Sequence, residues 1–534
     1  MTNIKRVFMV DGKPFFPLGG ECLHRSGYNV LDESEIEINF KAANLSHSNT
    51  VEFPIYWDEV EPEEGKFNFK SVDTLLSIAR RYKVKLIILW FATWYCGNMD
   101  YAPPWMKINP QRYKRVMSPI LPDGKAVWVL SSHCKANLEA DKQAFNALCK
   151  YLKGKDSTKH TVIGIQVENE AGIIGSDRDY GPEAQAEFDS PVPAKLMSSI
   201  KAAGKGEVYD LWQRAGGKKS GNWPEIFGPE AGELLSAWSL ATYINAIATA
   251  GKTAYDIPMF INPWISIGSR WWPIPGEGYP AGGAVHKVLD IYKWFTPDVD
   301  FIGPDNYVSN IKDYELVCTK YARDDNPLFM PEALCNLNML RAIADYNAIG
   351  YFVQFNADVD GLISPNVRLR NELLQCVAAA IPLLIKYQGT GKVHAVVQEA
   401  EKEIAGQVQH LDLEGYMGLI EFGQQHNTGQ PEERFEPWDR GGGLVIQASK
   451  NEFYLVGQNY RFLLRPKPSL GKPQAVTLDA EGSHPDWKRF SKAISVDEGY
   501  FDQNGEFVPE RRREIIFGVW VRHDAGVIRV ITCD

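Results

Sequence analysis

The stretch VIGIQVENEAGIIG, residues 162–175, decides the fold that we predict for this chain. Residues 162–167 are largely apolar and predict a buried strand, and this strand runs directly into Glu168, Asn169 and Glu170. Burying a carboxylate costs free energy unless the charge is paired or used. We therefore expect the strand to open into a site at its carboxyl end.

Short apolar runs of this kind alternate with helical patterns along most of the chain. The predicted strands are 14–20, 49–55, 84–92, 162–168, 257–262, 299–304, 327–331 and 349–355. The predicted helices are one capped by Ser71, one capped by Asn137, and those over 229–250, 284–295, 338–347 and 368–387.

Eight strands, each followed by a helix, are typical of a (β/α)8 TIM barrel, an α/β fold. Continuous apolar runs also fit strands that are covered on both faces. A doubly wound sheet is the rival, but it would carry a GxGxxG turn after its first strand, which Gly19-Gly20-Glu21 does not supply. The barrel is therefore the predicted fold.

The pattern changes after about residue 390, where strand-like runs separated by turn residues dominate. They predict a smaller all-β C-terminal domain, either a sandwich or a barrel. Because 534 residues exceed the usual size of one domain, we predict a catalytic barrel over 1–388 and the all-β domain over 389–534.

Composition excludes several classes of function. The net charge of −10 argues against a nucleic-acid partner. No apolar run is long enough to cross a membrane, and the first residues do not resemble a signal peptide, so we expect no membrane partner and a cytoplasmic protein. The eight cysteines are scattered without CxxC spacing, which predicts free thiols and no metal site. We also expect no cofactor, and the oligomeric state stays open.

Acidic, amide and aromatic side chains follow the predicted strands, where a barrel places its chemistry. They are Glu21, His24, Arg25, Trp57, Asp58, Trp94, Asn98, Glu168, Asn169, Glu170, Asn262, Trp264, Asp305, Tyr307, Glu332, Gln354, Asn356 and Asp358. Amides and carboxylates suit sugar hydroxyls, aromatic faces suit C–H patches, and two acids suit a glycosidic bond. The set predicts a carbohydrate substrate.

We expect the substrate-binding contacts to come from both polar and aromatic members of this set. The polar candidates are Arg25, Asn98, Asn169, Asn262 and Tyr307, and the aromatic candidates are Trp57, Trp94 and Trp264. Each tryptophan is equally consistent with packing in the wall of the barrel. Trp271 and Trp272, in a long Gly/Pro-rich loop, would suit further sugar units.

Four stretches of the chain resemble glycoside hydrolase family 35, the β-galactosidases of clan A. They are NTVEFPIYWDEVEPEEGKFNF (49–69), GIQVENEAG (164–172), YPAGGAVHKVLDIYKWFTPDVDFIGPDNY (279–307) and NPLFMPEAL (326–334). The resemblance covers about 1–390, and the tail is similar to the C-terminal domain of a bacterial-type subgroup.

The resemblance implies a retaining exo-glycoside hydrolase that releases terminal non-reducing β-D-galactose from oligo- or polysaccharides. It implies that Glu170 is the general acid/base and Glu332 the nucleophile. It also implies that Asn169 hydrogen-bonds the sugar 2-hydroxyl and that Tyr307 holds the nucleophile. For Glu168, we expect a supporting role through the pKa of Glu170 or a pair with Arg25.

The chain departs from this pattern at two positions that hold galactose in the relatives. Pro54 replaces a tyrosine, and YCGNMDY (95–101) replaces an Ala-Glu pair. The terminal sugar therefore stays open, with arabinosyl, fucosyl and glucosyl ends as alternatives. A non-catalytic carbohydrate-binding barrel is a further alternative, and the lack of metal-ligand spacing argues against a metal-dependent hydrolase.

Overall fold

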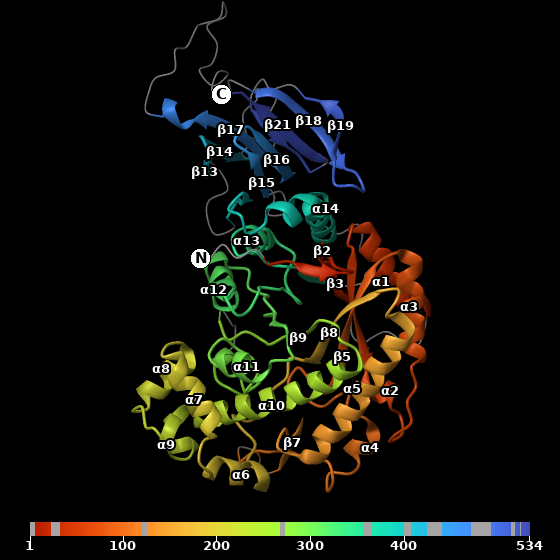
Figure 1. Cartoon of the computed structure of the whole chain (residues 1–534), viewed down its shortest axis with the longest axis vertical. Helices are drawn as coiled ribbons and strands as arrows, with labels where there is room; N and C mark the ends of the chain where they lie inside the picture. The colour runs from red at the N-terminus through yellow and green to blue at the C-terminus, as the bar shows by residue number, and fades with distance from the viewer. Residues whose placement is uncertain are drawn as a thin grey trace, which may run out of the picture.

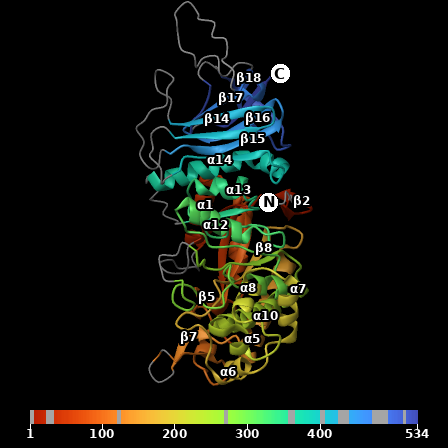
Figure 2. The same cartoon turned by 90° about the vertical axis from the view of Figure 1, so that its left-hand side faces the viewer.

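A computed structural model describes residues 6–22, 33–119, 121, 125–267, 273–355, 365–399, 407–423, 440–470, 493–513, 518–523 and 525–533. The molecule is elongated, with an α/β part at one end and a β-rich part at the other (Figure 1). Helix α14 (Pro365–Tyr387) lies across the junction between them, as Figure 2 shows.

The α/β part is a (β/α)8 barrel, as the sequence predicts. Its strands are β3 (Leu18–Cys22), β4 (Thr50–Tyr56), β5 (Lys85–Tyr95), β8 (Val162–Asn169), β9 (Met259–Ile261), β10 (Phe301–Ile302) and β11 (Tyr351–Phe355). They pair in parallel in the order β10-β9-β8-β5-β4-β3-β11.

Residues 328–333 occupy the place of the remaining strand, between β10 and β11. Met330 bridges Tyr351 in parallel, and Ala333 bridges Asn306 in parallel. These bridges close the ring, so the predicted strand at 327–331 is present as a short bridging segment.

Helices surround the ring, and shorter helices and strands precede its first strand or lie in the connections. The helices that follow the strands are α1 (Glu33–Leu45), α3 (Lys70–Tyr82), α5 (Lys135–Asp156), α10 (Ala231–Ala254), α11 (Leu289–Phe295), α12 (Ile311–Tyr321), α13 (Asn338–Ala344) and α14. The other elements are β1 (Phe8–Val10), β2 (Lys13–Phe15), α2 (Trp57–Val60), α4 (Pro104–Lys107), β6 (Arg115–Met117), β7 (Ala126–Leu130), α6 (Pro182–Asp189), α7 (Ala194–Ala203), α8 (Glu207–Arg214), α9 (Trp223–Phe227) and η2 (Gly228–Glu230).

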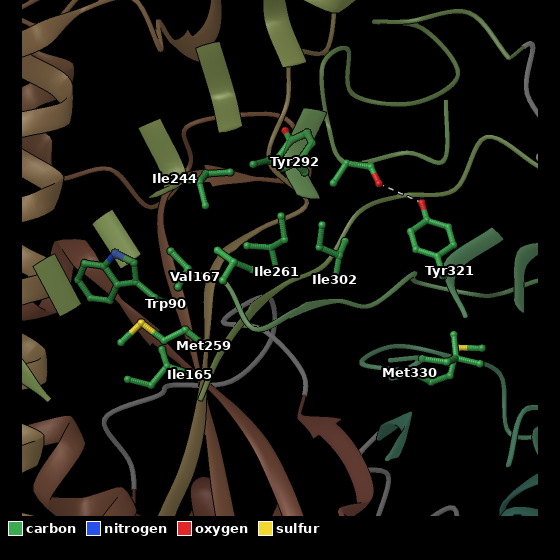
Figure 3. Close-up of a cluster of buried hydrophobic side chains, with 14 of the residues drawn as sticks. Trp90, Ile165, Val167, Ile244, Met259, Ile261, Tyr292, Ile302, Tyr321 and Met330 are labelled. Atoms are coloured by element: carbon green, nitrogen blue, oxygen red, sulfur yellow. Dashed lines mark hydrogen bonds between the residues drawn. The ribbon is translucent and has the colours of Figure 1, made fainter. Parts of the chain in front are cut away.

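Alternation along the strands builds two apolar layers. In β5, Trp90 faces outward with its even-numbered neighbours, whereas Leu89 faces the barrel interior. Figure 3 shows part of the outer layer, in which Trp90 and Val167 of the strands belong to one buried cluster with Ile244 of α10 and Tyr292 of α11. Stacked and tilted aromatic rings, with centroids 4.9–5.4 Å apart, fill the interior: Phe260, Phe301, Phe329 and Phe352. The barrel is therefore a packed core, and its polar groups gather at one end.

The β-rich part is a sandwich of antiparallel sheets, which decides between the two predicted alternatives. One sheet has the order β12-β15-β16-β21-β18-β19 and the other β13-β14-β17-β20. The strands are β12 (Val393–Val397), β13 (Val408–Leu413), β14 (Tyr416–Phe422), β15 (Gly442–Ser449), β16 (Glu452–Gln458), β17 (Tyr460–Pro466), β18 (Ala493–Phe501), β19 (Phe507–Arg512), β20 (Val519–Val521) and β21 (Val527–Thr532), with η5 (Lys467–Ser469) after β17. Residues from both sheets, such as Val445 and Phe462, form one buried cluster between them.

A single hydrophobic core joins the barrel to the sandwich. It runs from the barrel helices through Leu373 and Val377 of α14 to Leu444 and Ile446 of β15. The packing is therefore continuous across the predicted boundary at 388/389. The division of the chain into two domains at this boundary stays a prediction.

Some local predictions are wrong. The first barrel strand begins at Leu18, because residues 13–15 pair with β1 instead. Ser71 and Asn137 do not cap helices: α3 and α5 start earlier, with Phe69 and Cys134 at the N-cap positions. Asn137 lies inside α5 and donates hydrogen bonds to the Lys114 and Ser131 carbonyls.

Two further predictions concern the cysteines and membrane-spanning helices. All eight cysteines lie in described segments, and none of them is in a disulfide bond. Among the described helices, none combines the length and the apolar character that crossing a bilayer would require.

Candidate active site

Three carboxylates meet at the carboxyl ends of the barrel strands. Glu170 follows β8, Asp305 follows β10 and Glu332 lies near the end of the bridging segment 328–333, and all three side chains are buried. One carboxylate oxygen from each lies within 4.8 Å of the other two. Such a group could also hold a cation, so the expectation of no metal stays a prediction.

The backbone of Glu170 is fixed by neighbours on both sides. Its φ of 48° is left-handed, which is unfavourable for a non-glycine residue. Its N–H donates to Asn262 Oδ1 at 3.0 Å, and its carbonyl accepts from the Gly97 N–H at 3.2 Å. The end of β8 is thus tied to the residues that follow β9 and β5.

Asn262 connects the site further. Its Nδ2 donates to Asn169 Oδ1 at 3.1 Å and to Asp305 Oδ2 at 2.9 Å. Asn169 Oδ1 also accepts from Gln166 Nε2 at 3.0 Å. One amide therefore sets the relative positions of Asn169, Glu170 and Asp305.

Burial and the nearby charge of Glu332 raise the pKa of Glu170 to about 7. Hydrogen bonds from the Cys96 thiol, the Asp305 carboxyl and the Trp264 indole act in the opposite direction but are weaker. At neutral pH the Glu170 carboxyl can therefore both release and accept a proton.

Glu332 is held from the neighbouring strand end. The Tyr307 hydroxyl donates to Glu332 Oε2 at 2.6 Å, and the Asn306 N–H donates to the Glu332 carbonyl at 2.8 Å. Burial and the charge of Glu332 raise the pKa of Tyr307, so this hydroxyl stays a donor. Two groups of the neighbouring strand end thus hold the side chain and the backbone of Glu332 in place.

Two more acids lie inside the barrel close to Glu332. Glu21 of β3 and Glu52 of β4 are buried, and burial followed by the charge of Glu332 raises both pKa values well above the usual range. The same two causes raise the pKa of Asp305. The cluster therefore keeps most of its carboxyls neutral, and Glu21 hydrogen-bonds Glu332 in its protonated form.

The structure brings four of the sequence-predicted contact residues to this site and leaves others elsewhere. Asn169, Asn262, Trp264 and Tyr307 surround the three carboxylates. Asn98 is half-buried, and its Oδ1 accepts the Asp100 N–H at 2.9 Å, closing a turn. Arg25, like His24, Trp271, Trp272, Asn356 and Asp358, lies outside the described residues.

The structure does not bring the rings of Trp57 and Trp94 to the site, and both are fully buried. Trp94 points outward from β5 and meets Tyr243 of α10 edge to face at 4.8 Å. The Trp57 indole N–H donates to Glu61 Oε2 at 2.8 Å, and the ring packs against Trp90. Trp57, the first residue of α2, and Trp94 of β5 both pack into the outer apolar layer and so build the wall of the barrel.

Four further residues shape the site. Asp305 stands at a predicted strand end two residues before Tyr307, and that position is a usable signal. Glu52 interrupts an apolar strand run, which is also a signal, because an isolated acid in a core strand needs an explanation. Cys96 and Asp141 carry no such mark in the sequence, since a lone cysteine in a turn and an aspartate in a helix are ordinary.

Two family models match parts of the chain. Residues 29–244 match the model of glycoside hydrolase family 42, described as Beta-galactosidase. Residues 372–514 match a domain of unknown function, DUF5597, which begins inside α14. The matching glycosidase model is thus that of family 42, whereas the sequence motifs resemble family 35.

Curated relatives are similar over about a third of the chain. Beta-galactosidase 17 of Arabidopsis thaliana is 27% identical over 179 residues, which are 32% of this chain and 23% of the relative. A Beta-galactosidase of Xanthomonas manihotis is 23% identical over 186 residues, 34% of this chain and 28% of the relative. The chain therefore matches about a quarter of the length of these relatives.

Solved structures show a weaker likeness. A beta-galactosidase from the psychrophilic Marinomonas ef1 gives a TM-score of 0.47 at 12% identity, covering 69% of this chain and 62% of that one. The catalytic domain of a beta-amylase from Paenibacillus polymyxa gives 0.44 at 12% identity, covering 64% and 93%.

Proposed function

We propose that the protein is a retaining exo-glycoside hydrolase that releases terminal non-reducing β-D-galactose from oligo- or polysaccharides. The observation that carries the proposal is the facing pair of Glu170 and Glu332, with carboxylate oxygens within 4.8 Å. Retaining glycosidases place their two carboxyl groups about 5–5.5 Å apart, whereas inverting ones leave about 6.5–9.5 Å for a water. The short separation supports retention.

The family match supports a galactoside as substrate. The matched range 29–244 contains Asn169 and Glu170, and the family description and the relatives' names all refer to beta-galactosidase. The acidic, amide-rich site is suited to carbohydrate, as the sequence suggests.

In the proposed first step Glu332 attacks the anomeric carbon. Tyr307 holds its carboxylate, and protonated Glu170 donates its proton to the departing glycosidic oxygen. The products of this step are a covalent glycosyl-enzyme and a neutral leaving alcohol.

In the second step Glu170 acts as a base. Ester formation removes the charge of Glu332, which is one of the two causes that raise the pKa of Glu170. The pKa of Glu170 therefore falls when the intermediate forms, and its carboxylate can take a proton from the attacking water. Water then releases the sugar with its original anomeric configuration.

We assign substrate contacts to the residues that already touch the two acids. Asn169 would contact the sugar 2-hydroxyl beside Glu332, and Trp264, whose indole hydrogen-bonds Glu170, would lie on the leaving-group side. Cys96, which contacts Glu170, lies in the stretch where the relatives carry an Ala-Glu pair, so the terminal sugar needs direct measurement.

The experiment is hydrolysis of aryl β-glycosides, including galactoside, arabinoside, fucoside and glucoside, by the wild type, Glu332→Ala and Glu170→Ala. We expect β-galactoside cleavage with retention by NMR. We also expect azide to rescue Glu332→Ala as the α-glycosyl azide and Glu170→Ala as the β-glycosyl azide. Inversion, or undiminished activity in Glu332→Ala, would overturn the proposed mechanism. Preferred cleavage of another glycoside would mean that the terminal sugar is not galactose.

A further inference from the structure

The pairing between β5 and β8 opens immediately before Glu170. Trp90 pairs with Val167, and the next pair is Tyr95 with Asn169, so residues 91–94 of β5 lie opposite the single residue Glu168. A bulge of this kind leaves backbone groups of the longer strand without their usual partners, and bulges are over-represented next to active sites.

The side chain of Glu168 fills this gap. Its Oε2 accepts the Trp94 N–H at 2.8 Å, and its carboxyl also receives a hydrogen bond from the Thr93 backbone. The Glu168 side chain thus replaces the backbone pairing that the bulge removes.

The backbone around Glu168 needs such support. Glu168 has a φ of 64° and Glu170 a φ of 48°, with only Asn169 between them. A left-handed conformation is strained for a non-glycine residue, because its Cβ comes too close to the following carbonyl oxygen. Two such residues persist only where their surroundings hold them.

Asp141 of α5 supports Glu168 from the side away from the substrate. It is fully buried, and it accepts from the Trp90 indole N–H at 3.1 Å and from the Thr93 hydroxyl at 2.5 Å. Its carboxyl also hydrogen-bonds the carboxyl of Glu168. Two carboxyls can bond to each other only if one carries a proton, and burial with the charge of Asp141 raises the pKa of Glu168 so that Glu168 keeps it.

We propose that Glu168 and Asp141 form a positioning pair for Glu170, in which the hydrogen-bonded carboxyls clamp the β5 bulge to the end of β8 and fix where the Glu170 carboxyl points. Neither residue touches the reacting atoms. The inference rests on the proposed function, because it assumes that Glu170 protonates the leaving group.

The test uses the dependence of rate on the leaving group. A phenyl glycoside needs a proton from Glu170, whereas a 2,4-dinitrophenyl glycoside leaves without one. For the sugar that the wild type cleaves, we expect Glu168→Ala to lower kcat/KM about 100-fold on the phenyl glycoside and only a few-fold on the dinitrophenyl glycoside, because general acid catalysis contributes roughly 10²–10⁴-fold.

Two further variants test the shared proton and guard against misfolding. Glu168→Gln keeps the donor to Asp141 and the acceptor for the Trp94 N–H, so we expect near wild-type rates on both substrates. Glu168→Asp is too short to reach both partners, so we expect the same selective loss as in Glu168→Ala. Glu183→Ala, in the exposed part of α6, is the matched control and should change neither rate.

The rates of the variants distinguish a positioning role of the pair from a purely structural one. Equal losses on both substrates in Glu168→Ala and Glu168→Asp would mean that the pair is only structural, which overturns the inference. If Glu168→Gln is as impaired as Glu168→Ala, the proposal that Glu168 and Asp141 share a proton is wrong. If the wild type cleaves neither substrate, the proposed function itself is wrong, and no comparison among variants is needed to see it.

Discussion

Glu168 and Glu170 show how surroundings give two identical side chains different roles. Both are buried, and both have raised pKa values. Glu170 faces Glu332 across the site, whereas Glu168 faces the β5 backbone and Asp141. The first can exchange a proton with substrate, and the second is committed to holding the chain. Their different partners therefore give Glu170 a chemical role and Glu168 a positioning role.

The pKa of Glu170 predicts the pH dependence of the reaction. Because the protonated form is needed to begin catalysis and the pKa is about 7, kcat/KM should fall about tenfold per pH unit above pH 7. The pH profile of kcat/KM on a phenyl glycoside measures this limb.

The control for this profile is Glu170→Gln assayed with the dinitrophenyl glycoside. This substrate does not need the acid, so the alkaline limb should be absent. A limb near pH 7 that remains in Glu170→Gln would assign the titration to another group.

At the scale of elements, the sequence predicts the barrel strands well because buried parallel strands are continuous apolar runs. Strands β4, β5 and β8 lie within a few residues of their predicted bounds. The helix starts were harder, because Ser71 and Asn137 are good capping residues that the longer helices α3 and α5 incorporate instead.

Insertions and long-range contacts were beyond prediction. The prediction leaves out the short helices α6 to α9 and the β6–β7 hairpin, which lie in the connections after β8 and β5, although α9 begins with a capping box between Asn222 and Glu225. The same holds for the site: the sequence marks Glu170 and Glu332 at strand ends, but the approach of Asp141 to Glu168 depends on how α5 packs on β5. A periodic pattern carries no information about such a contact.

Helix α12, which follows Tyr307, begins with a side-chain cap. Asn310 Oδ1 accepts the N–H groups of Lys312 at 3.0 Å and Asp313 at 3.2 Å. We expect Asn310→Ala to lower the free energy of unfolding by about 1 kcal/mol, measured by urea denaturation. Asn310→Asp keeps the acceptor and should lose much less, and equal losses in the two variants would contradict the cap.

At the scale of the whole molecule, the sandwich and the barrel share one core. Leu337, in the segment that leads from Glu332 to α13, lies so close to Gly442 of β15 that a Cβ at Gly442 would be 2.5 Å from Leu337 Cδ2. The sandwich therefore supports the segment that follows the candidate nucleophile.

This shared core predicts that barrel and sandwich unfold together. We expect one transition in scanning calorimetry, and we expect Leu337→Ala to lower its stability by about 2 kcal/mol without splitting it. Phe453→Leu, inside the sandwich core, should lower the same transition. Two separate transitions, with Phe453→Leu moving only one, would show instead that the parts are independent.

The proposed mechanism requires Glu332 to form a covalent bond to galactose, and this bond can be trapped. The protein is incubated with 2,4-dinitrophenyl 2-deoxy-2-fluoro-β-D-galactoside, and the labelled peptide is mapped by mass spectrometry. We predict one fluorogalactosyl group on the peptide containing residues 326–334, attached to Glu332, and no label in Glu332→Gln. Label on Glu170 or Asp305, or turnover of a galactoside to the α-anomer with no label, would contradict the account.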